Sequence, residues 1–279
     1  MKNIMIFGAG GQLGRELARI IPDSISVYHA GGEEQIIADI SDSDRVTTLI
    51  EKYSPEIVIN ASAIANVDLC EKNQEAALSI NGTAVNGIAN ACREIDATLI
   101  HISTDYVFDG VHGNYTEKSI PNPINFYGLS KLIGDIYALS YKKSIVVRTS
   151  GVFGYTKNFP LFVLETLNSG KPVNAIEGFY SPIHARNLAL AVLELSKTDF
   201  KGIINISGER ISRYELAVEI AKEFGLEVSL VNEVKNVQTF NAKRPFDSSL
   251  DNSVGKNLIK FDYYSLMSNL KAMKDTIAK

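Results

Sequence analysis

The chain has only two cysteines, no tryptophan and no long apolar run, and each scarcity excludes a class of protein. Cys70 and Cys92 cannot supply the several cross-links of a disulfide framework, and they are typical of a reducing compartment. No stretch reaches the roughly 18 consecutive apolar residues of a membrane span. The N-terminus also lacks the pattern of a signal peptide. We therefore expect a cytoplasmic protein with no membrane partner.

Net charge and histidine are also low. A formal net charge of -4 over 279 residues gives no electrostatic reason to expect a nucleic-acid partner. His29, His101, His112 and His184 show no metal-ligand spacing, so we expect no metal site. His101 lies within a predicted buried strand and is expected to be a hydrogen-bonded core residue.

The first half of the chain alternates short apolar runs with longer amphipathic segments. This alternation is typical of a parallel sheet with helices on its faces. The predicted strands are residues 3–7, 25–29, 56–60, 98–103 and 144–149, and the predicted helices are 12–21, 42–53, 76–94 and 127–141. We predict the α/β class, with a doubly wound parallel Rossmann-type sheet.

The pattern changes after residue 150 and predicts a smaller C-terminal α/β domain. Helices are expected at 159–169, 184–196, 212–224 and 263–277, a strand at 203–207, and irregular structure over 232–257. Ser212 and Glu215 have the spacing of a capping box. We expect residues 1–150 with 183–201 to form a dinucleotide-binding domain, and 151–182 with 202–279 to form a substrate-binding domain over the carboxyl edge of the sheet, where ligands bind in such folds.

A glycine-rich turn directly follows the first predicted strand. Gly8 permits the tight turn, Gly11 lets the backbone approach a pyrophosphate, and Gly14 allows close packing of helix and strand. The N-terminus of the following helix supplies N–H groups and a positive dipole. The turn therefore predicts a site for NADP or NAD.

The residues around the second strand favour NADP over NAD. That strand does not end in the acidic residue that would bind the ribose hydroxyls of NAD, and Arg15 is placed to meet a 2′-phosphate. An exposed Arg15 with no ligand is the alternative. Asp39 and Ile40 are expected either to touch the adenine or to form an ordinary turn.

Tyr127 and Lys131 are four positions apart on a predicted helix and so share one face. A chain with 12 tyrosines contains such a Tyr-x-x-x-Lys pair by chance about once, so an ordinary exposed pair is the alternative. A nearby ammonium favours the phenolate and would lower the tyrosine pKa toward neutrality. We predict that Tyr127 transfers the proton, that Lys131 also binds the nicotinamide ribose, and that Ser103 or Thr104 polarises a carbonyl.

These motifs together resemble the extended short-chain dehydrogenase/reductases, and more narrowly the dTDP-4-dehydrorhamnose reductase family, over nearly the whole chain. Besides the glycine turn and the tyrosine–lysine pair, the matching segments are 60–63, 67–68, Asn81, 103–108, 123–131, 148–150 and 244–251. The Ser-Thr-Asp-Tyr-Val-Phe run from Ser103 and the Arg-Pro-x-x-Ser-x-Leu-Asp run from Arg244 are specific to this branch.

The resemblance implies a role for each matching residue. Thr104, Tyr127 and Lys131 would be catalytic. The cofactor would contact Gly8, Gly11, Gln12, Leu13, Asp39, Ile40, Ala61, Ser62, Ala63, Tyr127 and Lys131. A nucleotide sugar would face Asp105, Tyr106 and Asn158, and Arg244 would bind its pyrophosphate. The implied reaction is NAD(P)H-dependent reduction of the 4-keto group of dTDP-4-dehydro-6-deoxy-L-mannose, which gives dTDP-L-rhamnose.

The chain departs from the family pattern only on the substrate side. Gly151 stands where the family usually carries tryptophan, Ala65 replaces a threonine, and segment 177–183 differs. Two alternatives therefore stay open. The chain is a reductase or epimerase of another nucleotide sugar, or it resembles the NADP-binding β subunit of methionine adenosyltransferase, which serves as a partner protein. Homodimer formation also stays open.

Overall fold

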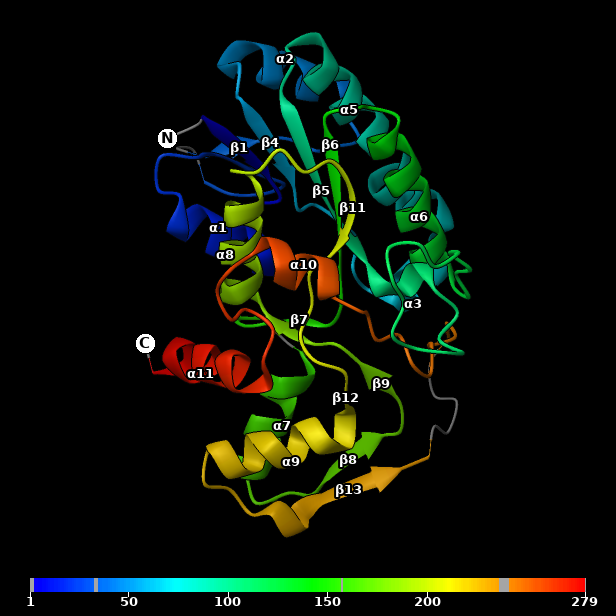
Figure 1. The fold of residues 1–279 in the computed structure, drawn as a ribbon, viewed down its shortest axis with the longest axis vertical. Coiled ribbons are helices and arrows are strands. Elements are labelled where there is room, and N and C mark those ends of the chain that lie inside the picture. Colours follow the sequence, from blue (N-terminus) through cyan, green and yellow to red (C-terminus); the bar gives the residue numbers. More distant parts are fainter. Residues whose placement is uncertain (1–2, 33–34, 157, 236–240, 279) are drawn as a thin grey trace.

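The computed structural model describes residues 3–32, 35–156, 158–235 and 241–278, and its centre is a seven-stranded sheet (Figure 1). The strand order is β11-β6-β5-β4-β1-β2-β3, and every neighbouring pair is parallel. Its strands are β1 (Ile4–Phe7), β2 (Ile25–Tyr28), β3 (Ile36–Ile37), β4 (Ile57–Asn60), β5 (Thr98–Thr104), β6 (Ser144–Thr149) and β11 (Gly202–Asn205). The predicted doubly wound α/β fold is confirmed.

Alternation along β1 divides the core of the sheet into two layers. Ile4 and Ile6 point into one layer and Met5 and Phe7 into the other, as the two-residue period of a strand requires. The first layer is covered by α1 (Gln12–Ile20) and α8 (Ala185–Leu195), and the second by α2 (Ser43–Tyr53), α5 (Ala84–Glu94) and α6 (Phe126–Leu139) (Figure 1). Both faces of the sheet are therefore dry, which explains why its strands are continuous apolar runs.

The helix predicted over 76–94 is interrupted. It consists of α4 (Gln74–Ala77), a π-helical segment (Leu78–Thr83) and α5, and α3 (Val67–Lys72) precedes it. The wider turn carries Asn81, whose side chain accepts from the Ile64 N–H (2.8 Å) and donates to the Ile64 carbonyl (3.1 Å) and the Ser130 hydroxyl (3.2 Å). This distortion has a positioning role, because it fixes the loop after β4 against helix α6.

The smaller part of the molecule packs around its own core beneath the sheet (Figure 1). Its helices are α7 (Phe159–Asn168), α9 (Arg213–Glu223) and α11 (Leu266–Ile277), whereas α10 (Ser253–Leu258) packs against β11 and the core of the large sheet. Its strand pairs are β7 (Val152–Phe153) with β10 (Ile183–His184), β8 (Val173–Ile176) with β13 (Val231–Val234), and β9 (Phe179–Tyr180) with β12 (Ile211–Ser212). Ser212 and Glu215 form the predicted capping box at the start of α9.

Two sequence predictions are wrong in this half. β11 pairs with β6 at the edge of the large sheet, so residues 202–205 belong with residues 1–150 and not with the smaller part. β13 and α10 occupy parts of the segment 232–257 that was predicted to be irregular, and residues 236–240 lie outside the described residues. Pairing of β13 with β8 stabilises this polar strand. No helix within the described ranges is long and apolar enough to cross a membrane.

Candidate active site

The glycine turn lies between β1 and α1, and Gly8, Gly11 and Gly14 meet different requirements in it. Gly8 has φ +81°, and a Cβ there would lie 2.7 Å from the Ser62 nitrogen. A Cβ at Gly14 would overlap the Gly8 carbonyl oxygen. Gly11 has φ −74° and is exposed, and its Cβ would meet that oxygen at 3.3 Å. The fold therefore requires Gly8 and Gly14. Gly11 instead leaves the exposed side of the turn without a side chain, so that a ligand can approach the backbone.

Helix α1 begins at this turn without a side-chain cap. Its N-cap is Gly11, and no side chain accepts from its first-turn N–H groups. By contrast, Asp42 caps α2 and Asn125 caps α6 through their side chains. Free N–H groups and the helix dipole suit an anion at this position.

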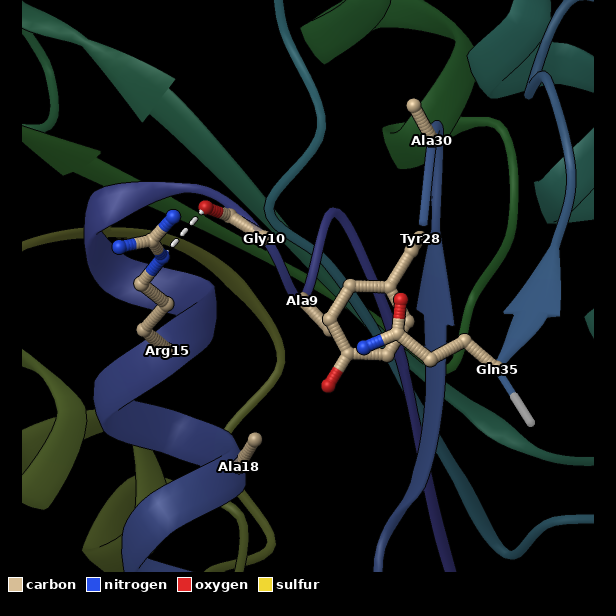
Figure 2. Close-up of a pocket in the computed structure, with 7 residues that line it drawn as sticks. All are labelled: Ala9, Gly10, Arg15, Ala18, Tyr28, Ala30 and Gln35. Atoms are coloured by element: carbon tan, nitrogen blue, oxygen red, sulfur yellow. Dashed lines mark hydrogen bonds between the residues drawn. The ribbon is translucent and has the colours of Figure 1, made fainter. Parts of the chain in front are cut away.

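Two cavities flank the turn. A cavity of about 390 Å³ lies between α1 and β2 and is lined by Ala9, Gly10, Arg15, Ala18, Tyr28, Ala30 and Gln35 (Figure 2). A second cavity of about 530 Å³ lies over the carboxyl ends of the strands. It is lined by Gly11, Gln12, Leu13, Ala61, Ala63, Ala65, Val67, Ile102, Ser103, Thr104, Asp105, Tyr106, Tyr127, Lys131, Thr149, Gly151, Val152 and Thr156. A dinucleotide has two nucleoside halves joined by a pyrophosphate. Two cavities on either side of one glycine turn suit a molecule of this shape.

The first cavity contains Arg15 but not Asp39. The Arg15 Nε donates to the Gly10 carbonyl at 2.9 Å, and the guanidinium stays exposed at the cavity edge (Figure 2). Asp39 accepts from the backbone N–H of Ser41 (2.9 Å), which lowers the pKa of its carboxyl. Asp39 therefore shows the turn chemistry that was one of its two interpretations, and Ile40 is buried.

The second cavity brings together Thr104, Tyr127 and Lys131. Thr104 ends β5, and its hydroxyl lies within hydrogen-bonding reach of the Tyr127 phenol. Lys131 is only 2% exposed, and its Nζ donates to the Ile102 carbonyl at 2.6 Å. Helix α6 positions both the tyrosine and the lysine because Asn125 caps its first turn at the Gly128 N–H (2.9 Å).

The expected lowering of the Tyr127 pKa is not found. Burial raises the pKa of this phenol, and the Asp105 carboxylate acts in the same direction. The Lys131 ammonium is directed at a backbone carbonyl, and burial lowers its own pKa to about 8. Tyr127 is consequently protonated at neutral pH, which is the state that a proton donor needs.

His101, Asn60 and Asp135 lie beneath Lys131, and no sequence motif assigned them a role in the site. Asn60 Oδ1 accepts from the Ser62 N–H (3.1 Å), so Asn60 Nδ2 faces His101 Nδ1 (3.2 Å) as a donor. The other ring nitrogen, Nε2, lies 3.4 Å from Lys131 Nζ and 3.9 Å from Asp135 Oδ1. His101 is the hydrogen-bonded core residue that we expected, and burial lowers its pKa well below the usual value.

The remaining cofactor candidates lie around the turn. Gln12 bridges α1 to the β7 region, because its amide donates to the Val152 carbonyl (2.8 Å) and accepts from the Thr156 N–H (2.8 Å). Ala61 and Ala63 line the second cavity, whereas Ser62 lies behind Gly8.

The four predicted substrate residues differ in their surroundings. Asp105 and Tyr106 line the second cavity. Asn158 caps α7 by accepting from the Leu161 N–H (3.0 Å) and is not among the residues that line this cavity. Arg244 also lies outside this set, and it pairs with Asp68 at 2.8 Å.

Tyr180 and Arg213 stand behind the cavity wall, and no motif in the sequence indicated them. Gly151 lines the cavity with φ +48°, and a Cβ there would lie 2.6 Å from the ring of Tyr180. The Arg213 guanidinium lies over that ring, 4.9 Å from its centroid. Segment 177–183 departs from the family pattern, and its Tyr180 was the only available signal. No cluster of three potential metal ligands occurs among the described residues.

Comparisons with known proteins agree with this geometry. The family model described as RmlD substrate binding domain matches residues 1–278. A dTDP-4-dehydrorhamnose reductase of Aggregatibacter actinomycetemcomitans is 32% identical over 274 residues, covering 90% of this chain and 91% of the relative. The methionine adenosyltransferase 2 subunit beta of Rattus norvegicus is 30% identical over 272 residues, covering 90% and 80%.

Two solved structures are similar over almost the entire chain. A hypothetical dTDP-4-dehydrorhamnose reductase from Sulfolobus tokodaii is 47% identical with a TM-score of 0.91, covering 97% of this chain and 99% of that one. A dTDP-4-dehydrorhamnose reductase from Bacillus anthracis in complex with NADP is 27% identical with a TM-score of 0.89, covering 99% of both.

Proposed function

We propose a keto-sugar reduction for this chain, which belongs to the RmlD substrate binding domain family. The proposed reaction is NAD(P)H-dependent reduction of the 4-keto group of dTDP-4-dehydro-6-deoxy-L-mannose to dTDP-L-rhamnose. One observation carries the proposal. Thr104, Tyr127 and Lys131 line the same cavity as Gly11 and Gln12 of the glycine turn, so a proton donor lies beside the turn that suits a dinucleotide.

The residues present fit a dinucleotide. Gly11 and the uncapped first turn of α1 would hold the pyrophosphate, and Lys131 would bind the nicotinamide ribose. When bound, the reduced nicotinamide supplies the hydride. The Thr104 hydroxyl, which donates to Asp105 in this structure, would turn to donate to the reacting carbonyl oxygen, and Tyr127 would transfer its proton to that oxygen as negative charge develops.

NADP is the proposed preference over NAD. Arg15 sits at the edge of the adenosine-side cavity, where a guanidinium pairs well with a phosphate. The Bacillus anthracis structure, which holds NADP, supports the same preference. The altered Gly151 and Ala65 bear on the sugar and leave the proton-transfer residues unchanged.

The decisive experiment follows oxidation of NADPH, and then of NADH, with enzymatically generated dTDP-4-dehydro-6-deoxy-L-mannose. We expect turnover that depends on the sugar and is faster with NADPH. Tyr127→Phe should reduce kcat by roughly 10²–10⁴-fold while NADP still binds, because it removes only the acidic proton. Turnover of this variant at the wild-type rate would remove Tyr127 from the mechanism.

A non-catalytic NADP-binding subunit is the second candidate. It is favoured by the similarity to the methionine adenosyltransferase 2 subunit beta over 90% of the chain. Co-purification of the chain with a methionine adenosyltransferase in a fixed ratio, together with absence of sugar-dependent NADPH oxidation, would support this candidate over the reductase.

A further inference from the structure

The smaller domain contains Arg210, Arg213 and Arg244, and two of these three arginines have carboxylate partners. Arg244 pairs with Asp68 at 2.8 Å. Arg210 pairs with Asp247 at 2.7 Å. For Arg213, in contrast, no hydrogen bond or ion pair of the guanidinium is found within the described ranges. Its guanidinium makes a cation–π contact with the ring of Tyr180.

The position of Arg213 is fixed although its charge is not neutralised. It is the first residue of α9, whose start is held by the Ser212–Glu215 capping box. The side chain is partly buried beside Gly178, where a Cβ would lie 3.3 Å from Nη1. A partly buried guanidinium without an anion is costly, so the arrangement suits an anionic ligand.

Tyr180 supplies the second, independent observation. Its side chain is 7% exposed, and its hydroxyl is buried without a hydrogen-bond partner among the described residues. Burial raises the pKa of this hydroxyl, while the Arg213 guanidinium acts to lower it. Tyr106 and Asp105, which line the second cavity, act to raise it. A buried hydroxyl without a partner is a donor that an oxygen of a bound ligand could satisfy.

We propose that Arg213 and Tyr180 form a subsite for the diphosphate of the nucleotide sugar. Arg213 donates paired N–H groups to phosphate oxygens, and the Tyr180 hydroxyl donates to the same group. The Asp105 carboxylate is nearby but already accepts from Thr104 (3.0 Å), Ser150 (2.7 Å) and Ser248 (2.6 Å). Arg213 thus takes the role that the sequence assigned to Arg244. This inference rests on the proposed nucleotide-sugar substrate.

Calorimetric titration of the full chain with dTDP and with thymidine tests the subsite. Arg213→Met keeps an unbranched apolar stem over the Tyr180 ring and should weaken dTDP binding on the order of 10- to 100-fold. Tyr180→Phe removes only the hydroxyl and should weaken it about 3- to 10-fold. Neither change should alter the binding of thymidine or NADP. Arg45→Met, an exposed arginine on α2, is the matched control and should leave dTDP binding unchanged.

The outcomes separate this inference from the proposed function. If dTDP binds Arg213→Met and Tyr180→Phe as tightly as it binds wild type, the subsite is wrong, whatever the enzyme reduces. If UDP or GDP binds in place of dTDP and the variants weaken that binding, the subsite stands and the proposed sugar nucleotide is wrong. If wild type binds no nucleoside diphosphate, both are overturned. Tyr180→Phe retains the ring, so it tests the subsite even if Arg213→Met fails to fold.

Discussion

The hydroxyl of Ser248 donates a 2.6 Å hydrogen bond to the carboxylate of Asp105, 143 positions earlier in the chain. Ser150 donates to the same carboxylate oxygen from the end of β6 (2.7 Å), and Thr104 donates to the other oxygen (3.0 Å). Asp105 therefore joins two strands of the sheet to a loop of the smaller domain. Asp105, which lines the same cavity as Tyr127, thus also holds the two parts of the molecule together.

Ser248→Ala should lower the free energy of unfolding by about 2 kcal/mol, because it removes a buried hydrogen bond to a charged group. Urea denaturation measures this change. Ser253→Ala, an exposed serine on α10, is the control and should change stability by less than about 0.5 kcal/mol. Equal stability of Ser248→Ala and Ser253→Ala would show that Asp105 does not depend on this donor.

Gly11→Ala should weaken NADP binding and keep the fold, whereas Gly14→Ala should destabilise the fold itself. Gly11 has φ −74°, and an added Cβ would lie 3.3 Å from the Gly8 carbonyl oxygen, so the fold should survive. The methyl group should weaken NADP binding at least about 10-fold. At Gly14, a Cβ overlaps the Gly8 carbonyl, so this variant should lose stability by several kcal/mol, about the range of overpacked cores. Fluorescence titration with NADPH and thermal unfolding distinguish the two. Unchanged NADPH affinity in Gly11→Ala would contradict our placement of the pyrophosphate.

Arg15→Ala should raise KM for NADPH on the order of 10-fold and leave KM for NADH unchanged, because only NADP carries the phosphate. Steady-state kinetics with both cofactors measure the ratio. Arg19→Ala, one turn later on α1, is the control, since Arg19 pairs with Glu16 at 2.7 Å. A parallel rise in KM for NADPH and NADH would assign Arg15 a purely structural role.

The stability difference between wild type and Lys131→Met should depend on pH. Burial lowers the pKa of Lys131 from 10.5 to about 8, so below pH 8 the folded protein carries the full cost of a buried ammonium. Between about pH 8 and 10.5 the unfolded state binds more protons, and wild-type stability should rise relative to the variant by about 3 kcal/mol. Urea denaturation of both proteins at pH 7 and pH 10 measures this. A constant difference would show that the Lys131 pKa is not lowered.

Much of the fold follows from local sequence pattern. The strand around Met5 and the helix that carries Tyr127 have strong periodicity, and the glycine spacing identifies the turn between β1 and α1. β11 was misplaced for a physical reason. A short apolar strand has the same appearance in either domain, and only its pairing with β6 decides which sheet it joins.

The site was predictable where its residues are close in sequence. Tyr127 and Lys131 share a helix face, and both line the cavity with Thr104. The pairing of Arg244 with Asp68 spans 176 positions and depends on how the two domains meet, so no local pattern reveals it. The expected direction of the Tyr127 pKa shift was wrong because burial of the phenol raises its pKa, and burial depends on the tertiary structure.

The contact between Gly151 and Tyr180 couples two positions on different segments. A side chain at 151 would need a left-handed backbone and would collide with the ring at 2.6 Å. The ring of Tyr180 therefore occupies this part of the cavity wall because position 151 carries no side chain. Gly151→Trp should accordingly destabilise the protein twice over, through the collision and through the backbone. Shortening Tyr180 should relieve the collision and leave the backbone strain in place.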